Sequence, residues 1–170
     1  SDLLDYSTNS GASFPNAIIA STPSAAGSYA WTIPDDLTTT AQVRISDASD
    51  AAVFDDSAAD FSIQASFDVT APDGGEVWIV NESRNVTWTN VGSVSNVKID
   101  LSTNSGITFP TAVVASTANT NSYAWTVTDA ISATARVRVS DVLNANAFAD
   151  SDANFKIRGD LTLTAPNGGE

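Results

Sequence analysis

The 170-residue chain contains no cysteine, no histidine and no methionine. Without cysteine it can form neither a disulfide nor a thiolate metal site. Without histidine it lacks the commonest general base and the commonest transition-metal ligand. No apolar run approaches the roughly 18–20 residues of a membrane-spanning helix, so we expect no membrane span. The absences therefore argue against thiol, imidazole and membrane-embedded chemistry.

Positive charge is also scarce. Seven Lys and Arg stand against 20 Asp and Glu, which gives a net charge of −13 and a pI near 4.1. Such a surface repels phosphate backbones, so we expect no nucleic-acid partner. It favours cations or a solvating role instead. Hydrophobic residues make up 42% of the chain, which is enough for one or two small packed domains.

What the chain does contain is one pattern that occurs twice. Residues 28–32 read SYAWT and return unchanged as residues 122–126, which lie 94 positions later. Residues 41–47 match residues 135–141 at the same offset. A constant offset over several blocks indicates a tandem array of one module. A repeated module is a poor basis for catalysis at a single site.

The repeat predicts how the chain is organised. We expect a partial repeat over residues 1–65 that lacks the opening strands, and a complete repeat over residues 66–158. Residues 159–170 then form the first strand of a following repeat, because TAPDGGE at 70–76 returns as TAPNGGE at 164–170. With no methionine in the chain, we expect a segment of a longer protein that holds further copies on both sides. A fragment with arbitrary boundaries fits the sequence as well.

Within the complete copy, polar and apolar residues alternate with a period of two, and no helical stripe of useful length occurs. The clearest strand covers residues 97–101, where we expect three apolar side chains to point inward and Lys98 and Asp100 outward. Residues 135–139 repeat the pattern, and we expect Arg136 and Arg138 to face water. The predicted strands cover residues 67–71, 77–80, 85–89, 97–101, 112–115, 123–127, 135–139 and 154–157. Seven or eight short strands in about 94 residues, separated by turn signals, predict an all-β fold of tandem immunoglobulin (Ig)-like antiparallel β-sandwiches.

The blocks that return also resemble a known family. They cover residues 70–76 with Trp78, 86–89, 97–106, 122–127, 135–141 and 151–157. These blocks are similar to a tandem Ig- or fibronectin-like repeat of secreted bacterial and archaeal surface proteins. They are also similar to the Ser/Thr-rich cell-wall repeat of fungal GPI-anchored proteins. The resemblance implies an Ig-like fold, an extracellular or cell-surface setting and no enzymatic activity, and it transfers no functional residue.

Tryptophans could form a platform that binds sugars. Trp88 and Trp125, however, are in phase with the inward-facing Val86 and Val127, so we favour a place in the core for both. Trp78 follows a turn, and its role stays open.

Two acidic stretches, residues 47–60 and 141–154, are rich in the oxygen ligands that Ca²⁺ prefers. Comparison of the copies weakens a calcium site, because few of the acids occur in both. Asp47 and Asp56 match Asp141 and Asp150, whereas Asp50, Asp55 and Ala58 match Asn144, Ala149 and Asp152. We therefore favour turn chemistry and solubility, and assign no catalytic, cofactor-binding or metal-binding residue. A cation that links Glu76 or Glu170 to a neighbouring module is a weaker alternative.

These observations predict a non-catalytic extracellular or cell-surface segment that works as a spacer, stalk or fibre. Its partners are neighbouring repeats of the same chain or neighbouring subunits. The alternative is an adhesion or carbohydrate-binding module that binds surface glycans or proteins with the loops at one end of the sandwich. Repetition and the lack of His and Cys disfavour an enzyme.

Overall fold

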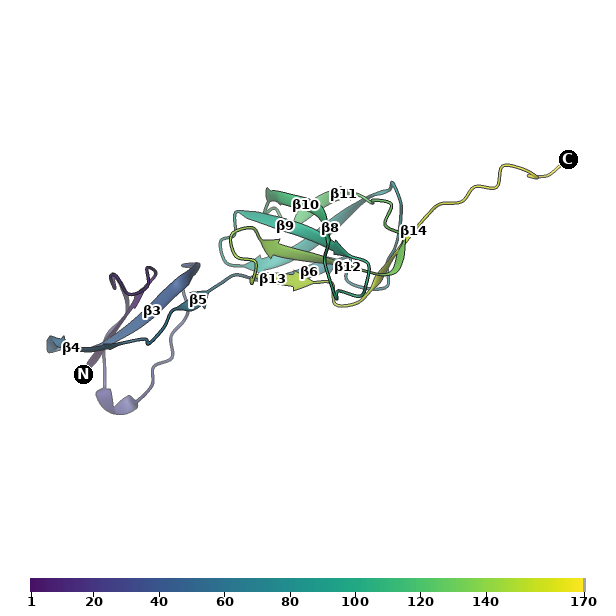
Figure 1. The fold of residues 1–170 in the computed structure, drawn as a ribbon. Helices are drawn as coiled ribbons and strands as arrows, with labels where there is room; N and C mark the ends of the chain where they lie inside the picture. The colour runs from purple at the N-terminus through teal and green to yellow at the C-terminus, as the bar shows by residue number, and fades with distance from the viewer. Residues whose placement is uncertain (170) are drawn as a thin grey trace. The chain divides into compact units, whose positions relative to one another are not determined.

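A computed structural model describes residues 1–169. These residues form β-strands and one short 3-10 helix, so the predicted all-β class is confirmed. The chain separates into two compact units, Ser1–Gln64 (unit 1) and Ala65–Glu170 (unit 2) (Figure 1). None of the described residues belongs to a helix long and apolar enough to cross a membrane. Glu170, proposed above as a cation ligand and as the end of the last strand, lies outside the described residues.

Unit 2 contains a larger sheet in the order β10-β9-β12-β14-β7, with β13 also paired to β12, and a smaller sheet in the order β11-β8-β6. All pairings in unit 2 are antiparallel except that of β14 with β7. The strands are β6 (Ser66–Ala71), β7 (Val77–Ile79), β8 (Ser83–Val91), β9 (Asn96–Ser102), β10 (Thr111–Ala118), β11 (Ser122–Thr126), β12 (Ser132–Asp141), β13 (Phe148–Asp150) and β14 (Phe155–Arg158). The eight strands predicted in this region are all present, with ends moved by a few residues, and β13 is additional.

The two sheets of unit 2 bury one common core. Successive side chains of a strand point to opposite faces, so each strand supplies every second residue to this core. β9 supplies Val97, Ile99 and Leu101, each at most 1% exposed, and the smaller sheet covers them with Val86 and Trp88. Unit 2 is therefore a β-sandwich-like domain.

The three tryptophans of unit 2 lie in that core. Trp88, Trp125 and Trp78 are 1%, 3% and 5% exposed. The ring of Trp78 packs edge-on against Trp125, with centroids 5.7 Å apart, and lies 5.2 Å from the ring of Phe155. The predicted core positions of Trp88 and Trp125 are confirmed, and Trp78 joins them. None of the three offers a face to a sugar.

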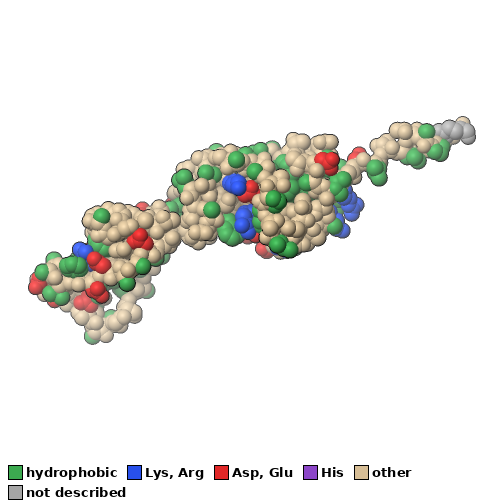
Figure 2. Space-filling model, viewed as in Figure 1, with side chains coloured by type: hydrophobic (Ala, Val, Ile, Leu, Met, Phe, Trp, Pro, Cys, Tyr) green, Lys and Arg blue, Asp and Glu red, His purple; other side chains and the backbone are tan. Residues whose placement is uncertain are grey.

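Unit 1 has a single sheet in the order β2-β1-β3-β4, with β5 paired to β3. Its elements are β1 (Asp2–Ser7), β2 (Asn16–Thr22), η1 (Ser24–Ala26), β3 (Thr38–Asp47), β4 (Asp50–Asp56) and β5 (Phe61–Ile63). Only three hydrophobic side chains among residues 1–64 are buried, namely Tyr6, Ala41 and Ile63. Hydrophobic side chains are visible on its surface in Figure 2.

The sheet of unit 1 repeats the register of the larger sheet of unit 2. Asp5 on β1 lies opposite Arg44 on β3, as Asp100 on β9 lies opposite Arg138 on β12. The inner faces differ in burial. Ile45 on β3 is 42% exposed, whereas the equivalent inner residue of β12 is fully buried. The same sheet therefore has a covered inner face in unit 2 and an open one in unit 1.

One identical sequence takes two conformations in the two units. In unit 2, SYAWT forms β11 and pairs with β8 along its whole length. In unit 1, the same sequence at residues 28–32 forms no strand and belongs to the loop that follows the short helix η1 (Figure 1). The described part of unit 1 has no counterpart of β8, so this segment has no strand edge to pair with. Tertiary context therefore overrides local strand propensity here.

The same explanation applies to the segment after β14. Residues 159–169 form no strand (Figure 1). Leu161 and Leu163 are 95% and 66% exposed. Its sequence matches β6, and β6 pairs only with β8 in unit 2. The predicted strand at residues 159–170 therefore has no pairing edge within the described chain.

Residues 66–158 contain both sheets and the whole common core, so we expect them to unfold alone in one cooperative thermal transition. Residues 1–65 bury too little apolar surface to offset the entropy of ordering, so we expect no cooperative transition from them alone. Calorimetry and near-ultraviolet circular dichroism measure both. A sharp transition of the 1–65 peptide would contradict this assignment of the core.

Two core tryptophans differ in hydrogen bonding. The Trp88 Nε1–H donates to Asn119 Oδ1 at 2.8 Å, whereas the buried Trp125 Nε1–H has no partner among the described residues. We expect Trp88→Phe to destabilise the protein by about 1 kcal/mol more than Trp125→Phe, because only the former breaks a hydrogen bond. Trp125→Ala should cost roughly 3–5 kcal/mol. Denaturant unfolding measures all three, and equal losses for the two Phe variants would refute the argument.

Candidate functional site: an arginine between two phenylalanines

The outer face of the larger sheet carries a cluster centred on Arg138. This residue alternates outward from β12, and the sequence predicted that it faces water. Its guanidinium carbon instead lies 4.3 Å from the ring centroid of Phe109 and 3.9 Å from that of Phe148. The outward direction of the Arg138 side chain was predicted correctly. Its exposure to water was not, because two aromatic rings cover the guanidinium. Such cation–π contacts hold an Arg against a sheet surface.

Arg138 also forms a forked ion pair. Its Nε and Nη2 donate to the two carboxylate oxygens of Asp150 at 2.6 and 2.8 Å. These hydrogen bonds, with the charges of Asp150 and Asp100, raise the pKa of Arg138 above its ordinary value. Asp150 lies on β13 directly opposite Arg138, so the pair joins two neighbouring strands.

Asp100 completes the outer-face cluster from β9. It points outward as predicted, and neighbouring side chains bury it to 6% exposure. Lys98 Nζ lies 2.9 Å from its carboxylate, and Arg138 lies opposite it in the ladder. Cationic neighbours compensate for the burial of this carboxylate.

Unit 1 contains the same cluster. The guanidinium of Arg44 lies 4.1 Å from the ring centroids of both Phe14 and Phe54. Its Nε and Nη2 donate to Asp56 at 2.6 and 2.8 Å. These hydrogen bonds hold the pKa of Asp56 below its ordinary value, so the pair stabilises the fold above the ordinary carboxyl pKa. That contribution is lost as pH falls through the lowered value. Asp5 lies beside Arg44, and burial is the main cause that raises its pKa.

The cluster can fasten strands but has little left to offer a ligand. Two of the Arg138 nitrogens donate to Asp150, and the rings occupy the space around the guanidinium. Phe109 belongs to the loop between β9 and β10, and Phe148 belongs to β13, so the contacts attach that loop and β13 to the sheet. The sequence carried a signal that was missed. Phe14 and Phe54 have Phe counterparts at the repeat offset.

The acids shared by both copies serve turns and ion pairs. Asp47 Oδ1 accepts hydrogen bonds from the backbone N–H and the hydroxyl of Ser49 at 2.8 and 2.7 Å, and these bonds lower the pKa of Asp47. Asp141 Oδ1 accepts from the Leu143 N–H at 2.9 Å. This is the turn chemistry that the sequence favoured over calcium. Nowhere in residues 1–169 do three acidic side chains gather in a group that could hold a metal.

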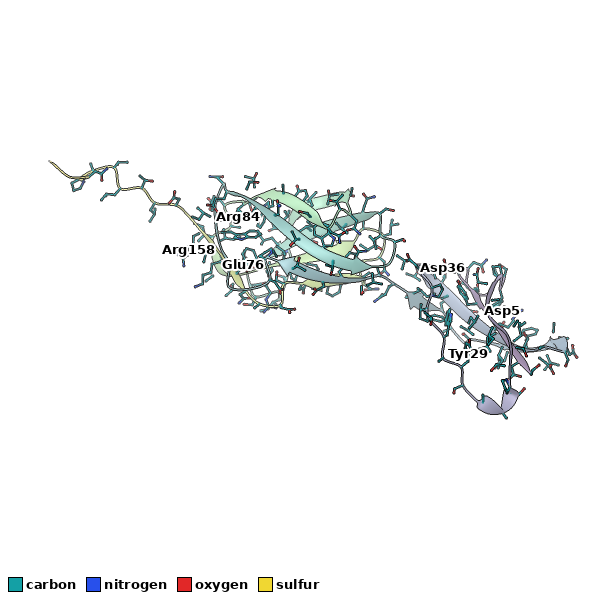
Figure 3. All side chains as sticks on the ribbon, turned by 180° about the vertical axis from the view of Figure 1, so that it is seen from behind. Asp5, Tyr29, Asp36, Glu76, Arg84 and Arg158 are labelled. Atoms are coloured by element: carbon teal, nitrogen blue, oxygen red, sulfur yellow. The ribbon has the colours of Figure 1, made fainter. Side chains whose placement is uncertain are left out.

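Glu76 closes its own turn rather than pointing toward a neighbouring module. Its two carboxylate oxygens accept the backbone N–H groups of Asp73 and Gly74, each at 2.8 Å. Gly74 has a φ of +142°, and a Cβ there would lie 2.5 Å from the Cβ of Ala153, so the turn requires glycine. Figure 3 shows Glu76 at the end of unit 2 that also holds Arg84 and Arg158. Two backbone donors already occupy this carboxylate, which weakens a cation bridge through Glu76.

Comparisons of the chain with protein-family models, curated proteins and solved structures found no match. The resemblance to surface-protein repeats is therefore an expectation from the sequence alone.

Arg138→Lys keeps the charge but removes the forked hydrogen bonds and the flat stacking surface. We expect it to lower the free energy of unfolding by about 1–2 kcal/mol, the scale of a charge-assisted hydrogen bond. Arg84→Lys is the matched control, because its pair with Glu82 is exposed and should change stability by less than about 0.5 kcal/mol. Urea denaturation of both variants measures the difference. If both variants lower the free energy of unfolding by the same small amount, the cluster does not stabilise the fold.

Proposed function

We propose that the chain is a non-catalytic structural segment of an extracellular or cell-surface protein. In this proposal, tandem Ig-like β-sandwich modules act as a spacer, stalk or fibre. One observation carries the proposal: the Arg–Asp cluster with its two Phe rings recurs in both units with nearly identical distances. What the two units share is thus a device that fastens strands, with its polar groups used internally. A module selected for shape needs such a device, and an active site needs free polar groups.

The strand order supports the Ig-like part of the proposal. In Ig domains the sheet that contains strands C, F and G faces a second sheet that contains strands A, B and E. Unit 2 has the same arrangement if β9, β12 and β14 correspond to C, F and G. The smaller sheet β11-β8-β6 then corresponds to E, B and A.

Surface charge supports the spacer role. Residues 1–64 carry nine Asp and one Arg, and acidic side chains are scattered over the visible face of unit 1 in Figure 2. Like-charged modules repel one another at low salt, which keeps an array soluble and extended. Strand fastening within modules and repulsion between them together suit a protein part that sets distance.

A spacer must resist pulling, so we expect unit 2 to unfold abruptly under force. Stretching the 170-residue chain by its ends should give one discrete extension, equal to the length of ~93 residues at ~3.3–3.6 Å each minus the folded span. Atomic-force or optical-tweezers measurements test this, and Arg138→Lys should lower the unfolding force. Smooth extension without a force peak would contradict a load-bearing module.

The alternative, an adhesion or carbohydrate-binding module, has one observation in its favour. Ile107 and Ile131 are 81% and 66% exposed on the loops that follow β9 and β11. Hydrogen bonds from Thr134 and Ser132 to Thr103 O tie these loops to the same end of unit 2. The test is saturable binding of glycans or proteins to the chain. If the chain binds and the Ile107→Ser, Ile131→Ser double variant does not, this alternative is favoured over a spacer.

A further inference from the structure

The inner face of the unit 1 sheet is apolar and only partly covered, by the chain between η1 and β3. Ile45 on the sheet is 42% exposed, and Tyr29 and Ile33 on that chain are 42% and 54% exposed. Two hollows open on this face, one between Leu4, Ile45 and Tyr29 and the other between Tyr6, Ile18 and Trp31. Exposed apolar surface of this kind is typical of a face that binds another polypeptide.

Unit 2 shows what covers the equivalent face. Its cover is the smaller sheet β11-β8-β6, and β7 extends the larger sheet beside β14; of these strands, β6, β7 and β8 lie within residues 66–95. β8 pairs with β11, and β7 pairs in parallel with β14, so that Trp78 lies beside Ile157. With this cover in place, Val127 and Val139, the counterparts of Ile33 and Ile45, are fully buried.

Unit 1 retains the sequences of both segments that pair with this cover. Residues 28–32 have the same sequence as β11, and β5 is the counterpart of β14. Trp31, the counterpart of Trp125, packs against the ring of Tyr6 with centroids 5.1 Å apart. The Tyr6 hydroxyl donates to Asp36, and this interaction raises the pKa of Tyr6 to about 12. Figure 3 labels Tyr29 and Asp36, which both lie on the chain between η1 and β3.

We propose that the inner face of unit 1 binds a polypeptide segment with the pattern of residues 66–95, supplied by a repeat of the proposed array, so this inference rests on the proposed function. The segment adds counterparts of β6, β7 and β8. Residues 28–32 then become a strand and pair with the β8 counterpart, which is recognition by strand addition. The side chains that correspond to Val86, Trp88 and Trp78 fill the two hollows.

The segment at residues 160–169 of a second copy is a poorer occupant, although Leu161 and Leu163 are exposed. It carries only the β6 pattern. In unit 2, β8 is the only strand that is hydrogen-bonded to β6 as a ladder partner. A β6-like strand alone therefore finds no pairing edge in unit 1.

Charge does not drive this binding. Residues 66–95 carry four acids and one Arg, and unit 1 is acidic as well. Apolar burial and backbone hydrogen bonds must then supply the attraction, so added salt should leave the binding unchanged or strengthen it.

The test is a full chain that carries an added copy of residues 66–95 directly before Ser1, as Ser95 directly precedes Asn96. We expect a second cooperative melting transition, and amide exchange at residues 28–32 slowed on the order of 100-fold or more. The control carries Val86→Asp and Trp88→Asp in the added copy only, and should show neither effect. Unchanged exchange at residues 28–32 in the soluble fusion would overturn the proposal.

A second measurement covers a fusion that fails to fold. The free peptide 66–95 is added to the 170-residue chain, and slowed exchange at residues 28–32 that persists at high salt supports the proposal. If the exchange rate at residues 28–32 stays unchanged at the highest peptide concentration, the proposal is overturned. Self-association of the chain that disappears when residues 160–170 are removed also overturns it. Either result leaves the spacer role untouched, because that role is tested by the unfolding force of unit 2.

Discussion

Closure of one apolar sheet face by a second sheet is the constraint on which this structure depends. In unit 2 the smaller sheet covers the inner side chains of β9 and β12, and fourteen residues become one buried core. In unit 1 the equivalent sheet has the same register but no cover, and only three hydrophobic side chains are buried. The difference lies in pairing partners rather than in the local sequence, because SYAWT is common to both units.

This dependence explains what the sequence could predict. Alternation with a period of two identified eight strands and the inward faces of Trp88 and Trp125, because that signal is local to each strand. It could not show that residues 28–32 stay unpaired, since a strand forms only where another edge is available. β13 was missed because it is three residues long and reads FAD, without the continuous apolar run that identified the equally short β7.

The outer-face cluster shows a second limit of sequence analysis. Arg138 was placed on the correct face, but the loop that carries Phe109 and the short β13 had no predicted position. Repetition nevertheless held useful information. Four acids that persist in both copies, Asp47, Asp56, Asp141 and Asp150, pair with Arg or close turns. Where an acid varies, the contact can still persist: Asp50 Oδ1 accepts from the Ala52 N–H, and its counterpart Asn144 Oδ1 accepts from the Asn146 N–H.

The outer cluster and the inner core are independent of each other. Arg44 keeps both rings and its forked pair with Asp56 in unit 1, although the inner face there is open. Contacts on the outer face therefore do not require a covered inner face. They are too few to make residues 1–65 unfold cooperatively alone, but each of them restricts the conformations of the open sheet. Because restricted groups have less conformational entropy left to lose, these contacts would lower the cost of adding strands to the inner face.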